Sequence, residues 1–143
     1  MKDDELISWE VCKREFIRNV EVDLERVESI KKKALLRLKR AKETEPSKDN
    51  ISFIVEDYYE VIKELLVAYM LKNGMRSKNH QCLISYFKKE NPEYEREVIL
   101  ISQMLFFRNR LDYYGEDIPK EFYDTNKEEF EKVINILLKK LLS

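Results

Sequence analysis

The chain has 143 residues, the size of one domain, and 43% of them are hydrophobic, which is enough to bury a single core. Its 27 lysines and arginines nearly balance 28 aspartates and glutamates, so the overall charge gives no indication of nucleic-acid binding. With only two glycines and three prolines, few positions suit the tight turns of β-hairpins, and the composition predicts a single all-α domain over residues 1–143.

Neither a membrane span nor a secretion signal is evident. The longest uninterrupted apolar run, residues 65–71, is far shorter than the roughly 20 residues that cross a bilayer. The first residues, MKDDE, are charged and do not resemble a signal peptide. We therefore expect a soluble, cytoplasmic protein with no membrane partner.

The first predicted element is one long helix over residues 4–42, because apolar residues recur there at every third or fourth position. Its segment 31–42, KKKALLRLKRAK, contains seven basic residues and no acidic one. Such a run is typical of a solvated helix end that complements the helix dipole. The alternative is a basic surface for phosphates or for an acidic partner.

The linker 43–50, ETEPSKDN, separates this helix from a second amphipathic helix that begins at residue 51 and ends at Gly74, a natural left-handed stop. Ser77 then begins a short helix over about residues 78–89. Pro92 is expected at the first position of the next helix, which Gly115 ends.

Thr125 and Glu128 resemble a capping box, which predicts a last helix over about residues 126–142. Five helices with mostly short connections predict an up-and-down bundle.

The two cysteines, Cys12 and Cys82, lie in separate helical patterns and are too few for a disulfide framework, so we expect small, buried, free thiols. His80 and Cys82 are two positions apart, about 200° around a helix, and therefore on opposite faces. Since the chain has no other histidine, we expect no metal site, and no cofactor is indicated.

The polar end of the fourth pattern, FFRNRLDYYG over residues 106–115, follows apolar turns. It resembles the motif of the HEPN domains (higher eukaryotes and prokaryotes nucleotide-binding), small helical bundles whose motif is an arginine, a polar residue and a histidine four to six positions beyond the arginine. Arg108 and Asn109 match, whereas Tyr113 occupies the histidine position. The segment 51–115 also resembles archaeal-type HEPN proteins.

This resemblance implies a homodimer in which two copies of the motif face a shared cleft, and in active members the cleft cleaves RNA without a metal. It also implies a partner, because many members are paired with minimal nucleotidyltransferases, often as toxin and antitoxin. Arg108 would hold or stabilise a phosphate and Asn109 would orient it. A phenol, with a pKa near 10, makes a poor general base, but Tyr113 and the neighbouring Tyr114 could bind a phosphate or stack on a base.

Simpler interpretations remain for each of these residues. Arg108 and Asp112 are four apart, so they could form a helix-surface ion pair that also supports the motif. The two tyrosines could pack over the helix end. On the second helix, Glu56 and Asp57 could face the motif, with Asp57 as a supporting residue, or could face solvent. His80 is expected to be a helix-start or core-edge residue.

Three functions follow. The first is a HEPN-like homodimer that binds nucleotide or RNA through a histidine-less motif and is the partner of a minimal nucleotidyltransferase. In a related hypothesis, such a partner modifies Tyr113 or Tyr114, because an exposed phenol beside cations can accept a nucleotidyl group. The second is an active, metal-independent endoribonuclease toxin that uses Arg108 and Tyr113. The third is a non-catalytic structural interaction module.

Overall fold

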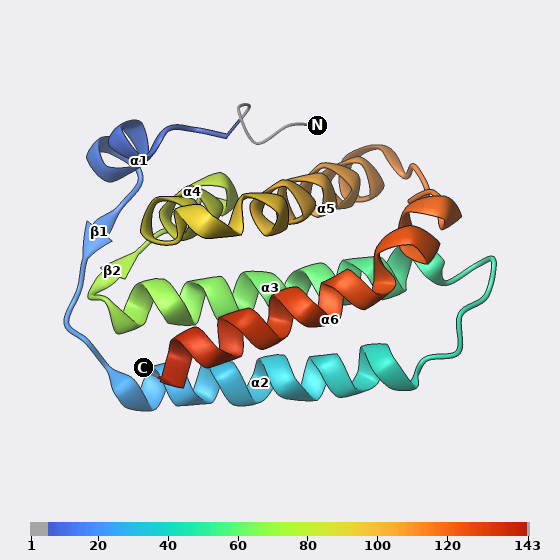
Figure 1. The fold of residues 1–143 in the computed structure, drawn as a ribbon, viewed down its shortest axis with the longest axis horizontal. Helices are drawn as coiled ribbons and strands as arrows, with labels where there is room; N and C mark the ends of the chain where they lie inside the picture. The colour runs from blue at the N-terminus through green and yellow to red at the C-terminus, as the bar shows by residue number, and fades with distance from the viewer. Residues whose placement is uncertain (1–5, 143) are drawn as a thin grey trace.

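The computed structural model describes residues 6–142, and these form the all-α bundle that the composition predicts (Figure 1). The described residues contain six α-helices, where about five were expected, with one 3-10 helix and a two-stranded antiparallel pair. In chain order the elements are α1 (Trp9–Glu15), β1 (Arg18–Asn19), α2 (Leu24–Glu43), α3 (Ile51–Lys72), β2 (Met75–Arg76), α4 (His80–Glu90), η2 (Pro92–Tyr94), α5 (Glu95–Tyr114) and α6 (Lys120–Leu142).

The central helix is α3, which contacts α2, α4, α5 and α6. Figure 1 shows α2, α3 and α6 as long, roughly parallel rods with α4 and α5 on the other side of α3. Because α3 has neighbours on so many sides, it buries apolar residues around most of its surface. The core is formed by large side chains of α3 to α6, among them Tyr59, Ile62, Leu65, Phe87, Ile101, Met104, Phe130 and Ile134.

The single helix predicted over residues 4–42 is wrong. Of its first residues, 4 and 5 lie outside the described part of the chain. The rest divides into α1 and α2, because Ser8 caps the first helix and the side chain of Asp23 accepts a hydrogen bond from the Arg26 backbone N–H at the start of the second. Between them the chain is extended and pairs with β2, with Arg18 opposite Arg76.

The expectation of free cysteines is also wrong, because Cys12 and Cys82 form a disulfide with an S–S distance of 2.06 Å. The bond joins α1 to α4, and both cysteines are fully buried. Hydrophobic spacing predicts that each cysteine is buried, but not that the two helices are neighbours, because the cysteines are 70 positions apart in the sequence.

Two glycines end helices in the predicted left-handed conformation, Gly74 with φ 78° and Gly115 with φ 64°. Three helix starts differ from prediction. Pro92 is the first residue of the 3-10 helix η2, and α5 itself begins at Glu95. The first residue of α4 is His80, since Asn79 rather than Ser77 caps it. The last helix begins at Lys120, directly after Pro119, so Thr125 lies within the helix and forms no capping box.

Among the described residues, no helix combines the length and apolar character that crossing a membrane requires.

Candidate functional site

The polar segment 108–114 forms the last two turns of α5. Gly115 ends the helix by donating its N–H to the carbonyl oxygen of Leu111 at 3.0 Å, and the Glu116 N–H reaches that of Arg110 at 3.3 Å. These bonds satisfy carbonyls that would otherwise be left without partners. The segment is therefore a regular helix end whose side chains have defined directions.

Arg108 lies between two carboxylates. Its Nε is 3.1 Å from Asp112 Oδ2 on the same helix and 3.8 Å from Glu60 Oε1 on α3. One terminal nitrogen donates to Asn109 Oδ1 at 3.2 Å. The ion pair that the spacing of Arg108 and Asp112 predicts is therefore present. Although close to Asp112, Nε is not aligned for a hydrogen bond and has no such partner among the described residues.

Two further charged residues of α3, Lys63 and Glu56, lie near Glu60. Glu60 also contacts Lys63, with the Lys63 Nζ 2.8 Å from Glu60 Oε2. Glu56 lies one turn before Glu60, and the four-residue spacing places both on one face of the helix. We refer to Glu56, Glu60, Lys63, His80, Arg108 and Asp112 as the Arg108 cluster.

Glu56 has an altered acidity within this cluster. Burial raises its pKa to about 7, and a hydrogen bond and the negative charge of Asp112 act in the same direction. The positive charge of Arg108 opposes this shift, whereas the negative charge of Glu60 adds to it. A carboxyl with a pKa near neutrality can both give and take a proton at physiological pH.

His80 reaches the cluster from α4. Its Nδ1 lies 2.9 Å from the hydroxyl of Tyr59, whose ring stacks against the imidazole. Burial lowers the pKa of His80, as do the charges of Lys63 and Arg108, while Glu60 acts against them. Burial also raises the pKa of the Tyr59 hydroxyl. His80 lies at the start of α4, as predicted, and with its lowered pKa the imidazole is mainly neutral at pH 7.

Asp57, the predicted supporting residue, faces α2 and not the Arg108 cluster. Its carboxylate is 2.6 Å from Arg40 and 4.0 Å from Arg37, both on α2. One position along a helix is a rotation of about 100°, so Asp57 faces α2 while Glu56 faces α5. Part of the basic segment 31–42 is therefore used within the fold, and Lys42 also pairs, with Glu131 of α6.

Tyr113 and Tyr114 do not pack over the helix end, since they are 72% and 70% exposed. The Arg110 guanidinium lies 5.1 Å from the centroid of the Tyr114 ring and binds Glu116 through two nitrogens, each at 2.6 Å from an oxygen. Beside the Arg108 cluster, the end of α5 therefore presents exposed aromatic rings and a cation.

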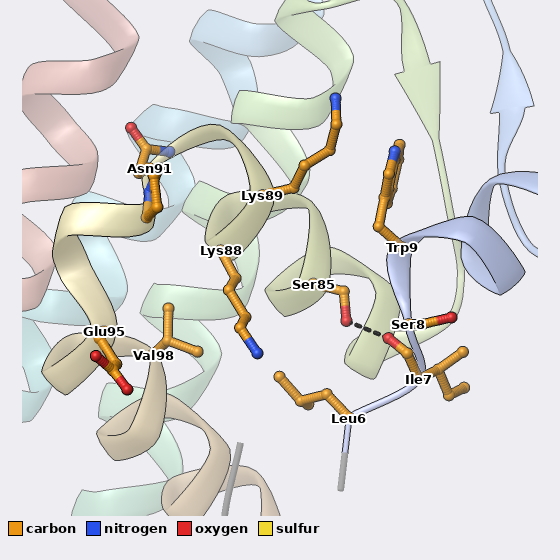
Figure 2. Close-up of a pocket in the computed structure, with 11 residues that line it drawn as sticks. Leu6, Ile7, Ser8, Trp9, Ser85, Lys88, Lys89, Asn91, Glu95 and Val98 are labelled. Atoms are coloured by element: carbon orange, nitrogen blue, oxygen red, sulfur yellow. Dashed lines mark hydrogen bonds between the residues drawn. The ribbon is translucent and has the colours of Figure 1, made fainter. Parts of the chain in front are cut away.

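A separate cavity of about 580 Å³ lies between the N-terminal segment and the α4–α5 corner (Figure 2). Lys88 extends into it, and Ser85 donates a hydrogen bond to the backbone carbonyl of Ile7 across its wall. No residue of the Arg108 cluster lines this cavity, so it is not part of the predicted site.

The described residues contain no group of three or more histidine, cysteine, aspartate or glutamate side chains arranged to hold a metal ion. No protein-family model matches the chain, and no curated protein or solved structure is significantly similar to it. A function can therefore be inferred only from the chemistry of the Arg108 cluster and from the resemblance of the motif.

Sequence reasoning did not place three residues of the cluster there, namely Glu60, Lys63 and His80. For Glu60 a signal existed, because its four-residue spacing from Glu56 predicts a shared face. For His80 there was no local signal, because its contact with Tyr59 depends on how α4 packs against α3, which the sequence pattern does not specify.

Proposed function

We propose that the protein is a HEPN-like homodimer that binds the phosphate groups of a nucleotide or RNA at Arg108 and Asn109. Its proposed partner is a minimal nucleotidyltransferase in a pair of the toxin–antitoxin type. The observation that supports this proposal most is the placement of Arg108, whose side chain is held by Asn109, Asp112 and Glu60 and is still 22% exposed.

An arginine held in this way is suited to phosphate binding. Its planar guanidinium matches two phosphate oxygens, and little further side-chain entropy is lost on binding. The exposed rings of Tyr113 and Tyr114 offer surfaces on which bases can stack. Nearby carboxylates oppose an anion, but protonation of Glu56 removes one negative charge as the pH falls below about 7.

Nucleotide titration of the wild type, Arg108→Ala and Arg40→Ala tests this proposal. Arg40 is a matched control, because it also pairs with a carboxylate but lies on α2. We expect the wild type and Arg40→Ala to bind ATP alike and Arg108→Ala to bind at least about tenfold more weakly, a loss of about 1.4 kcal/mol. Equal binding by all three proteins, or none by the wild type, would remove the site.

The second candidate is a metal-independent endoribonuclease, and one observation favours it. Glu56, with a pKa of about 7 next to Arg108, can transfer protons in the way that the motif histidine does in active members. Incubation of the wild type with single-stranded RNA in EDTA should give cleavage that Arg108→Ala abolishes. Intact RNA over a broad pH series would argue against this activity.

The disulfide bears on where such a protein resides. Disulfides persist mainly in oxidising compartments, and cytoplasmic proteins that retain them occur chiefly in hyperthermophiles. Because the proposed ligands and partner are cytoplasmic, we propose a cytoplasm in which Cys12–Cys82 stays oxidised. Rapid alkylation of thiols in intact cells tests this, and labelling of both cysteines would contradict it.

A further inference from the structure

Consecutive residues of the central helix α3 contact side chains from two other helices. Tyr59 and Glu60 are consecutive, and the first contacts His80 of α4 while the second contacts Arg108 of α5. The positive charge of Arg108 also helps to lower the pKa of His80, so the chain's single histidine lies within electrostatic range of this arginine although the two are far apart in the sequence.

Tyr59 fixes the orientation of the imidazole. Its side chain is 1% exposed, and its hydroxyl is 2.9 Å from His80 Nδ1. This contact uses one ring nitrogen and leaves Nε2 as the nitrogen for a ligand. When Nδ1–H donates to the phenol oxygen, Nε2 carries the free lone pair, as a general base requires.

We propose that His80, oriented by Tyr59, is the general base of a ribonuclease site in which Arg108 binds the scissile phosphate. This inference rests on the endoribonuclease candidate and replaces Tyr113 in the catalytic role that the motif alignment gave it. His80 and Arg108 would contact the substrate, whereas Tyr59 acts through His80 and is a positioning residue.

The proposed step balances with the residues of the cluster. His80 Nε2 takes the proton of the ribose 2′-hydroxyl as the 2′-oxygen forms a bond to phosphorus. The bond between phosphorus and the 5′-oxygen breaks, and that oxygen takes a proton from the Glu56 carboxyl. Arg108 stabilises the charge that develops on the phosphorane. The products are a 2′,3′-cyclic phosphate and a 5′-hydroxyl, and both catalysts then exchange protons with water.

The protonation states suit these roles. The pKa of His80 lies below its usual 6.5, because burial and the charges of Lys63 and Arg108 outweigh Glu60. The pKa of Glu56 is about 7, set by burial, Asp112, Arg108 and Glu60. A neutral imidazole and a protonated carboxyl therefore coexist between these two values. Activity should follow a bell-shaped pH profile with its maximum between the lowered His80 pKa and about 7.

The test compares cleavage of single-stranded RNA in EDTA by the wild type, His80→Gln, Tyr59→Phe and the control Arg40→Ala. We expect His80→Gln to lose about 100-fold or more in kcat, with little change in KM, and Arg40→Ala to cleave as the wild type does. Tyr59→Phe should retain part of the activity and move the acidic limb of the pH profile. Circular dichroism verifies that each variant is folded.

The outcomes distinguish the catalytic role of His80 from the ribonuclease activity itself. Cleavage by the wild type that His80→Gln leaves unchanged would overturn the role of His80 and preserve the ribonuclease. Absence of cleavage by the wild type would overturn both. A second measurement uses the wild type alone, with ¹⁵N NMR of His80 during titration with an RNA that has a single 2′-deoxy substitution at the cleavage position. We expect the Nε2 resonance to shift, and an unchanged resonance at saturation would contradict the proposal.

Discussion

Asp112 Oδ2 lies 3.1 Å from Nε of Arg108, one turn further along α5. By itself this pair would be an ordinary helix-surface contact worth a few tenths of a kcal/mol. This pair is not an isolated surface contact, because Glu60 of α3 also lies close to the same guanidinium. In addition, Asp112 raises the pKa of Glu56. The ion pair therefore links the motif to an ionisable group on another helix.

Phosphate binding should depend on pH through Glu56. Above about pH 7 its carboxylate adds a negative charge beside Arg108, and below that value the charge is lost. We therefore expect RNA affinity of the wild type to rise as the pH falls from 8 to 6.5, and the rise to be smaller in Glu56→Gln. Fluorescence anisotropy at constant ionic strength measures this, and identical pH profiles would contradict it.

Glu56 should also make the folding stability depend on pH, and the direction of this dependence follows from its raised pKa. The pKa in the fold, about 7, exceeds the ordinary value of 4.5, so the folded protein holds a proton that the unfolded chain releases between these values. Folding stability therefore falls as pH rises from 4.5 to 7. Glu56→Gln should be more stable than the wild type at pH 8 by about 1 kcal/mol, allowing for solvent screening, and should not be more stable at pH 4. Urea unfolding at both pH values measures the difference.

The disulfide should contribute substantially to stability. It closes a loop with a sequence separation of 70 residues, for which the chain-entropy model gives about 4 kcal/mol. Reductant should lower the urea midpoint of the wild type and leave that of Cys12→Ala/Cys82→Ala unchanged. Equal midpoints of the wild type with and without reductant, with reduction verified by thiol titration, would contradict this contribution.

Asp57 offers a test of which acidic residue of α3 supports the motif. Its carboxylate pairs with Arg40 and Arg37 and faces away from α5. We expect Asp57→Asn to cost up to about 1 kcal/mol in stability, as exposed pairs do, and to leave ATP affinity unchanged. A loss of ATP binding comparable with that of Arg108→Ala would show that Asp57 supports the site after all.

The parts of the fold that the sequence predicts are those set by local chemistry. The left-handed ends at Gly74 and Gly115 follow from residue type, and the buried stripes follow from periodicity. The break between α1 and α2 was missed because the apolar spacing continues through residues 16–23, while the extended conformation there pairs with β2, far along the chain.

In the candidate site, too, only the contacts between residues close in the sequence could be predicted. The ion pair of Arg108 and Asp112 is predictable because four residues separate them. The contact between Tyr59 and His80 and the bond between Cys12 and Cys82 depend on the docking of α4 against α3 and α1, which helical periodicity does not specify. Consequently the sequence indicates Tyr113 for proton transfer, whereas in the fold Arg108 affects the pKa values of Glu56 and His80, which lie on other helices.

The most direct test of a phosphate site at Arg108 is the affinity for a labelled single-stranded RNA, measured by fluorescence anisotropy over a series of salt concentrations. The account predicts that the wild type binds with steep salt dependence, and that Arg108→Ala binds more weakly with a log–log slope reduced by about one. Arg40→Ala should retain the slope of the wild type. Identical affinities and slopes for the wild type and Arg108→Ala would contradict a phosphate-binding site at this helix end.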